Sequence, residues 1–379
     1  MRLHLRPTLA ALVAVGLAGG CSSSSRSAPV TSTGAKVSAA SSAEQAGAWP
    51  ALVSRVPAGA ISSDRLWIVD VARARELAGI AHPAAGASAD ELVKDQAALG
   101  RVGASSPSRL LAARAAQRQD EVRKEIGFAA SDIERVVQAG QVPGTIEVAD
   151  GRIEPAATKA AVESDPVWSK ALQAATYQGS PLFTWGADGA VDTSKITPLR
   201  PVGDAIRLAV TPGHALFAQT TNGLHQLLDV AAGRTPSMIG QADVALVASR
   251  FDGEPVYAGF VGRSDVNDPR AGSSSTSVPS RHLVFGSAVG KDARGTFLLL
   301  VFVHPDEGSA AAKRTALDEL LTTGKSIRTS APWTKVFTST AVTVDGRVVM
   351  ARLRIDATRS AMWSQLVLVG ENVVALGAS

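Results

Sequence analysis

The sequence predicts an α+β fold with mixed or antiparallel sheets and flanking helices. The first observation is the alternation of apolar side chains in VVMARLRI, residues 348–355, which is typical of a strand with one buried face. The second is turn chemistry, because Asp345-Gly346 and Pro212-Gly213 each separate two runs that resemble strands. The third is the helical spacing of three leucines in NGLHQLLDVAAG. Tight hairpins mixed with amphipathic helices favour this class.

The N-terminal part is expected to begin with a buried strand that leads into a helix over residues 65–80, followed by helices at residues 89–102 and 108–126. We also expect SDIERVVQAG, residues 131–140, to form a short helix. Ser131 and Glu134 match a capping box there, and Gly140 stands where a C-terminal cap belongs.

The run TIEVADGRI is expected to be a strand that ends in an Asp150-Gly151 turn, after which Pro155 begins a helix. Residues 193–203, TSKITPLRPVG, are polar, contain two prolines and lack periodicity. We therefore place a domain boundary there, between an N-terminal domain at residues 49–195 and a C-terminal domain at residues 196–379.

The C-terminal part begins with two strands around Pro212-Gly213 and a helix at residues 222–233. Residues 262–280 are rich in serine, proline and aspartate and are expected to form a loop. The remaining expected elements are strands at residues 282–289 and 295–304, a helix at residues 309–322 and a hairpin whose Asp345-Gly346 dipeptide forms a type I′ turn.

Two stretches resemble each other, which suggests duplicated halves. EVADGRI and TVDGRVV are each followed by a tryptophan, Trp168 and Trp363, at the same distance from the glycine. Both tryptophans lie beside apolar residues on expected helices. We therefore expect both rings to be buried core anchors rather than ligand platforms.

The amino terminus resembles an export signal. Arg2 and Arg6 precede a short apolar run, and Cys21, the only cysteine, follows two glycines. LAGGC resembles the lipobox of bacterial lipoproteins, although Ala18 stands where that family usually has leucine, valine or isoleucine. The resemblance implies a signal peptide at residues 1–20, a lipid on Cys21 and a location at the outer face of the plasma membrane. A secreted protein with a free thiol is the alternative.

Residues 21–48 are mostly serine, alanine, glycine and threonine, which predicts a flexible tether. The rest of the chain loosely resembles uncharacterised secreted lipoproteins of actinobacteria, and this resemblance implies no particular reaction. Removal of Arg2 and Arg6 would lower the formal net charge of +4 to +2. The lysines and arginines form no basic stripe, so we expect no nucleic-acid partner.

Sequence motifs for catalysis are weak or absent. TTGKS, residues 322–326, ends like a phosphate-binding loop but lacks the first glycine of that motif, and Gly324 is better explained as a helix cap. No G-x-S-x-G motif occurs, and no serine is followed by lysine at the third position. His214, His225, His282 and His304 are candidate bases, but each is more typical of a surface or cap position.

His304, Asp306 and Glu307 form the best local cluster for a metal ion, and they are weak candidates. The same residues are typical of a polar turn whose acids favour the next helix N-terminus. We expect no cofactor and no metal.

The sequence therefore predicts a lipid-anchored envelope protein that binds another protein or an envelope component without catalysis. The alternatives are a solute-binding component of a transporter and a hydrolase with an unrecognised site. A solute-binding protein would need two doubly wound lobes.

Overall fold

The computed structural model describes residues 48–60, 65–84, 87–104, 107–140, 144–166, 172–263, 282–326 and 329–368. Cys21, the expected tether except for Ala48, Trp168 and the expected loop beyond Arg263 lie outside these described residues. Within the described ranges, no helix combines the length and the apolar character that a membrane crossing requires.

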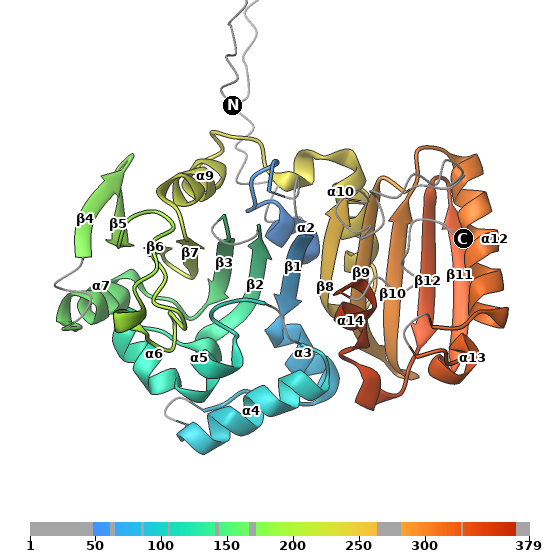
Figure 1. Ribbon diagram of the computed structural model, residues 1–379, viewed down its shortest axis with the longest axis horizontal. Helices are drawn as coiled ribbons and strands as arrows, with labels where there is room; N and C mark the ends of the chain where they lie inside the picture. The colour runs from blue at the N-terminus through green and yellow to red at the C-terminus, as the bar shows by residue number, and fades with distance from the viewer. Residues whose placement is uncertain are drawn as a thin grey trace, which may run out of the picture. The chain divides into compact units, whose positions relative to one another are not determined.

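A single antiparallel sheet of twelve strands organises the chain (Figure 1). The strands are β1 (Arg65–Asp70), β2 (Ile133–Ala139), β3 (Ile146–Gly151), β4 (Leu172–Tyr177), β5 (Ser180–Trp185), β6 (Ile206–Thr211), β7 (His214–Ala218), β8 (Val256–Arg263), β9 (Val284–Asp292), β10 (Gly295–Val303), β11 (Ser339–Asp345) and β12 (Val348–Arg354). Their order is β11-β12-β10-β9-β8-β1-β2-β3-β7-β6-β5-β4. The expected α+β class is confirmed, and the sheet is antiparallel throughout.

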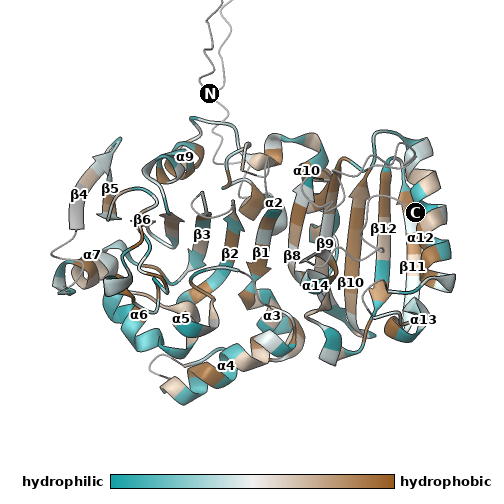
Figure 2. Cartoon of the chain, in the orientation of Figure 1, coloured by the Kyte–Doolittle hydropathy of each residue, from teal (hydrophilic) through white to brown (hydrophobic). Residues whose placement is uncertain are grey.

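Helices cover both faces of the sheet, so most strands are buried on both sides, and strand β10 is strongly hydrophobic (Figure 2). One face is covered by α3 (Val71–Ala78), α4 (Ala89–Arg101), α5 (Ala113–Gln117), α6 (Gln119–Ile126), α7 (Pro155–Ser164), α12 (Glu307–Thr323), α13 (Trp333–Val336) and α14 (Met362–Leu368). The other face is covered by α2 (Ala48–Val53), α9 (Thr221–Ala231) and α10 (Ala242–Asp252).

The strand order repeats about the β1–β8 pair. Moving outward from β1, the sheet runs through β2, β3, β7 and β6; moving outward from β8, it runs through β9, β10, β12 and β11. In both halves a helix precedes the first strand, and the last two strands form a hairpin that turns back beside the third. The strand order thus supports duplicated halves. The similar stretches EVADGRI and TVDGRVV do not occupy equivalent positions in the two halves, because Gly151 ends β3 whereas Gly346 lies in the β11–β12 turn.

Two expected helices are corrected by the structure. The segment SDIERVVQAG contributes strand β2, because residues 133–139 pair with both β1 and β3 and bury Ile133, Val136 and Val137. These β-branched residues suit a strand between two others, and the pairing overrides the local helix signals. Residues 108–126 are divided into α5 and α6. The residues before α5 are hydrogen-bonded to strand β3, since the Ser108 hydroxyl and the Arg109 amide both donate to Glu147.

Two expected turns also differ. The Asp150-Gly151 pair makes no hairpin, because β3 runs through Gly151 before the chain reaches α7. The β11–β12 turn is formed by Gly346 and Arg347, and of these two only Gly346 has a positive φ, 54°. That pattern is typical of a type II′ turn rather than type I′.

The two halves of the repeat are joined by more than the β1–β8 ladder. Trp363 of α14 is fully buried, which confirms its expected role as a core anchor, and its Nε1 donates to the Gly103 carbonyl at 2.9 Å. The Trp363 ring also contacts Trp67 of β1, with centroids 5.7 Å apart. Strands β6 and β7 follow the expected boundary at residues 193–203, yet they pair with β5 and β3, which precede it. The boundary stays a prediction.

Candidate functional site

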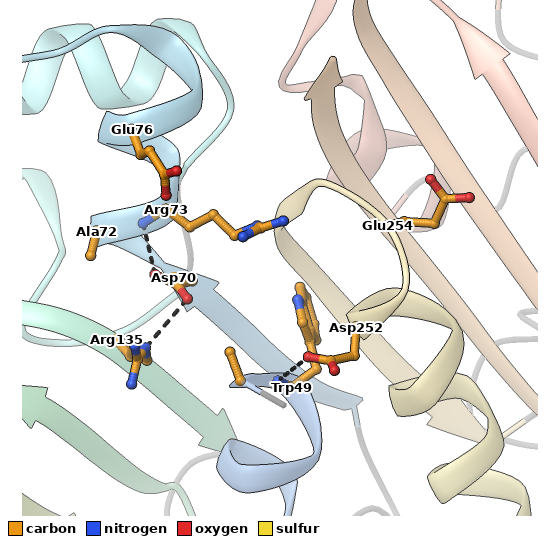
Figure 3. Close-up of a pocket in the computed structure, with 9 residues that line it drawn as sticks. Trp49, Asp70, Ala72, Arg73, Glu76, Arg135, Asp252 and Glu254 are labelled. Carbon is orange, nitrogen blue, oxygen red and sulfur yellow. Dashed lines mark hydrogen bonds and ion pairs between the residues drawn. The ribbon is translucent and has the colours of Figure 1, made fainter. Parts of the chain in front are cut away.

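A pocket of about 280 Å³ lies where the two halves meet, beside the end of strand β1. The last residue of β1, the first turn of α3, the start of β2 and the turn between α10 and β8 surround it, with the start of α2 alongside (Figure 3). We call it the junction pocket, and it is lined by Ala48, Trp49, Asp70, Ala72, Arg73, Glu76, Arg135, Asp252 and Glu254. Six of these nine residues are charged, so the pocket is suited to a polar ligand.

Asp70 organises one wall of the junction pocket. It ends β1 and caps α3, with its Oδ1 accepting from the Arg73 amide at 2.9 Å. Its Oδ2 accepts from Arg135 Nε at 3.3 Å, across the β1–β2 ladder. Burial raises the pKa of Asp70, although both hydrogen bonds act in the opposite direction. Since both oxygens are engaged, Asp70 positions its neighbours rather than offering a free acid.

The start of α2 and the end of α10 bring the two halves together beside the pocket. The Trp49 amide donates to Asp252 Oδ1 at 3.4 Å, and the Trp49 ring packs edge-on against Phe251 with centroids 4.9 Å apart. Trp49 is buried, while Asp252 is exposed. The packing of Trp49 against Phe251 therefore positions the Asp252 carboxylate beside the pocket.

Glu254 belongs to a separate ionic network at the side of the junction pocket. Its Oε2 accepts from Arg352 Nη1 at 2.5 Å, and Arg352 Nη2 reaches Asp292 at 2.6 Å. Arg354 also pairs with Asp292, and its hydrogen bond holds the pKa of that carboxyl well below the usual range. The charge of Glu254 is therefore already balanced.

Two charged side chains of α3 are not balanced in this way. Among the described residues, neither the Arg73 guanidinium nor the Glu76 carboxylate forms an ion pair. Figure 3 shows Arg73 extending from α3 toward the side of the pocket formed by the α10–β8 turn. The pocket thus presents a cation without an ion pair, Arg73, and nearby carboxylates to a ligand, while its other arginine, Arg135, pairs with Asp70.

A larger hollow of about 460 Å³ lies between residues 57–60 and the start of α9. Its described lining consists of small, apolar and neutral polar residues, and none of them is charged. It offers neutral hydrogen-bonding groups but no charge to pair with a charged ligand, which makes the junction pocket the better candidate site for such a ligand.

The expected metal candidates do not come together. His304 is fully buried after β10, whereas Asp306 is exposed and caps α12 by accepting from the Ser309 amide at 2.7 Å. Glu307 is exposed in the first turn of α12. Within the described parts of the chain, no cluster of three histidine, cysteine, aspartate or glutamate side chains is placed to hold a metal ion. The polar-turn interpretation fits Asp306 and Glu307. It is wrong for His304, and the expected surface or cap position is also wrong for His282, because both side chains are fully buried.

His214 and His225 have different neighbours, whereas His282 packs against His304 with ring centroids 6.2 Å apart. His214 is half-exposed, with its Nδ1 2.9 Å from Asp150 and 2.8 Å from Arg55. His225 stacks on Tyr177, with ring centroids 3.7 Å apart, and His282 is buried. Gly324 ends α12 by donating its amide to the Leu320 carbonyl, which supports its role as a cap rather than part of a phosphate loop.

The sequence analysis missed the residues of the junction pocket. A signal existed for one of them, because Asp70 stands between a buried strand and a helix, where an N-cap is expected. Arg135 was hidden by the mistaken helix at residues 131–140. No sequence pattern links Trp49, Asp70 and Asp252, which are distant in the chain and meet only through the sheet.

Comparisons with known proteins add no function. No protein-family model matches the chain, and no curated protein matches it. Among solved structures, crystal forms I and IV of TP0453 match with 8% and 9% sequence identity, covering 82% and 84% of this chain and 97% and 98% of that chain, with a TM-score of 0.38. Likeness at this level carries no inference about this chain, and no specific function is shown.

Proposed function

We propose that the protein is a lipid-anchored envelope protein, held at the outer face of the plasma membrane through Cys21, that acts by binding rather than catalysis. The export signal and the LAGGC sequence support the anchor. The junction pocket supports the binding role, because it gathers charged side chains from both halves around a hollow suited to a small molecule. Its size is near the lower end of the ~300–1,000 Å³ that is typical of ligand pockets.

The ligand chemistry follows from Arg73 and Glu76, which form no ion pair among the described residues. A ligand carboxylate would pair with the Arg73 guanidinium through two hydrogen bonds. A ligand ammonium group would face the carboxylates of Glu76 and Asp252. A ligand with only a negative charge would leave the two carboxylates without a counter-charge, and a ligand with only a positive charge would leave Arg73 without one. We therefore propose a small zwitterion with one carboxylate and one amine, such as a short peptide from the envelope.

The transporter alternative is less well supported. Solute-binding proteins use two α/β lobes, whereas here β1 and β8 pair across the midpoint and continue one antiparallel sheet. The hydrolase alternative has less support, since the lining of the junction pocket contains no serine, threonine, cysteine, lysine or histidine to act as a hydroxyl, thiol, amine or imidazole nucleophile.

Calorimetric titration of the full chain with alanyl-alanine tests the ligand class. We expect binding of the dipeptide, and no binding of acetate or ethylamine, which each carry one of the two charges. Arg73→Gln should weaken dipeptide binding by about tenfold or more, because a charge-assisted contact is lost. Arg118→Gln is the matched control, since Arg118 is exposed between α5 and α6. Equal binding by both variants would contradict the proposed ligand site.

The anchor is tested separately. Cys21→Ser should move the protein from the membrane fraction to the medium or leave the signal peptide uncleaved, because the lipid-bearing atom is lost. Mass spectrometry of the mature amino terminus of the natural chain should find Cys21 acylated. An unmodified thiol at Cys21 would rule out the lipoprotein proposal while leaving the binding proposal intact.

A further inference from the structure

Strand β11 forms one edge of the sheet and is open to solvent. It pairs with β12 alone, and every residue except Val342 is exposed. Val344 is 43% exposed, which is high for a large apolar side chain. No backbone hydrogen bond other than those to β12 is recorded for residues 339–345 within the described chain. The outer row of N–H and C=O groups of β11 is therefore available to another strand.

Natural edge strands usually carry features that prevent such pairing, including charged side chains, prolines and bulges. Residues 339–344, STAVTV, have no charge and no proline, and they pair with β12 in continuous register. The only charge in β11, Asp345, is at its end and forms an ion pair with Arg250. An unprotected, β-prone edge in a folded protein indicates an interaction surface.

The register of the hairpin fixes which residues face outward. Asp345 and Val348 flank a two-residue turn, so they exchange hydrogen bonds, and the alternation continues along the strand. Thr340, Val342 and Val344 therefore direct their N–H and C=O groups away from β12. If two copies of β11 pair antiparallel about Val342, Thr340 of one copy lies opposite Val344 of the other. The residues whose backbone N–H and C=O groups point away from β12 then face one another along the whole strand.

We propose that β11 pairs antiparallel with β11 of a second copy of this chain, with Val342 opposite Val342. The paired side chains on the Val342 face are then all β-branched, which favours cross-strand packing. Asp345 lies opposite Ser339, so no like charges meet. Helix α12 runs beside β11 (Figure 1), and the pairing brings the α12 helices of the two copies side by side. The sheet continues across the dimer.

Cysteine cross-linking tests both the dimer and its register. Cys21 is the only natural cysteine, so Cys21→Ser in the full chain leaves an introduced cysteine as the sole thiol. Val342→Cys should form a disulfide dimer under mild oxidation, because opposed residues lie about 5.5 Å apart between Cα atoms, within disulfide reach. Val344→Cys is the matched control on the same face of the same strand. Its partner in the second copy would lie about 13 Å away along the strand, too far to bridge.

Sedimentation of the full chain without introduced cysteines gives a second measurement. Val342→Pro removes an N–H that points away from β12, so the β11–β12 hydrogen bonds are kept, and it should weaken the dimer by about tenfold or more. Gln117→Lys, at an exposed position on α5 in the other half, should leave the dimer, the folding and the far-ultraviolet circular dichroism unchanged and serves as the surface control. Cross-linking at residue 342 but not at residue 344, with loss of the dimer in Val342→Pro, supports the proposal. A monomer at all concentrations, or equal cross-linking at both positions, overturns it. A monomer that binds an extended peptide would assign the edge to a different protein.

Discussion

The two halves of the molecule share a strand order but treat buried charge differently. In the N-terminal half, buried ionic groups are matched with partners. Arg75 of α3 and Asp95 of α4 are both almost fully buried, and Arg75 Nη2 lies 2.7 Å from Asp95 Oδ2. Glu147 of β3 is 3% exposed and accepts hydrogen bonds from Ser108 and from the Arg109 amide. Arg75, Asp95 and Glu147 thus have a donor or an opposite charge beside them, although burial still raises the pKa of Glu147.

In the C-terminal half, buried basic groups are shifted toward their neutral forms. His304 is fully buried, and neither ring nitrogen has a hydrogen-bond partner among the described residues. Burial, with a smaller contribution from Lys313, lowers the pKa of His304 to about 4, while Asp306 acts in the opposite direction. Burial also lowers the pKa of Lys313, which lies over the Phe302 ring, to about 8.

One strand order therefore accommodates buried ionisable groups in two ways. A matched ion pair stays charged in the core but makes stability depend on both partners. A buried base without a hydrogen-bond partner, such as His304, is tolerated by losing its charge, and this makes stability depend on pH instead. The Arg75–Asp95 pair should therefore be sensitive to removal of one partner, and the surroundings of His304 should be sensitive to acid.

The largest expected effect comes from uncoupling the halves. Trp363→Ala should lower the free energy of unfolding by about 3–5 kcal/mol, because it removes a fully buried ring and the hydrogen bond to Gly103. Denaturant unfolding measures this loss. Ser364→Ala, one residue further along α14, is the control and should change little. A midpoint for Trp363→Ala equal to that of the natural chain would show that the halves do not depend on this contact.

The next effect tests the matched charges of the N-terminal half. Arg75→Met should destabilise the fold by about 3 kcal/mol, because it leaves the Asp95 carboxylate buried without a counter-charge. Adding Asp95→Leu should restore most of the loss, since two apolar residues can replace a buried ion pair. Thermal or denaturant unfolding of the single and double variants gives the comparison. A double variant less stable than Arg75→Met would contradict the account.

The smallest effect tests the acid sensitivity of the C-terminal half. The folded-state pKa of His304, about 4, lies below its unfolded value of 6.5, so the unfolded chain binds the proton first. The stability is then complete above pH 6.5 and should fall by about 1–3 kcal/mol as the pH drops to 4. His304→Leu should flatten the stability profile in this window, whereas the exposed His82→Phe should not. If the stability profile of His304→Leu coincides with that of the natural chain, other groups cause the pH dependence.

Sequence reasoning located local elements well and the candidate site poorly. Hairpins β6–β7 and β11–β12 and helices α4, α9 and α12 are found close to where turn residues and helical spacing predict them. These signals act within a few residues. The junction pocket depends on Asp70, Arg135 and Asp252, whose proximity follows from strand pairing and cannot be recovered from local spacing.

The α+β class, the hairpins and the apolar face of β12 could be predicted from the sequence alone, because turn chemistry and side-chain alternation are properties of short segments. The sequence also carries the export-signal pattern around Cys21. Only the tertiary structure decided that residues 133–139 form a strand, that β7 lies beside β3, that β1 and β8 join the two halves, and that β11 is left at an open edge. Those outcomes depend on which segments bury one another's surfaces, and pairing between distant segments can outweigh local propensity.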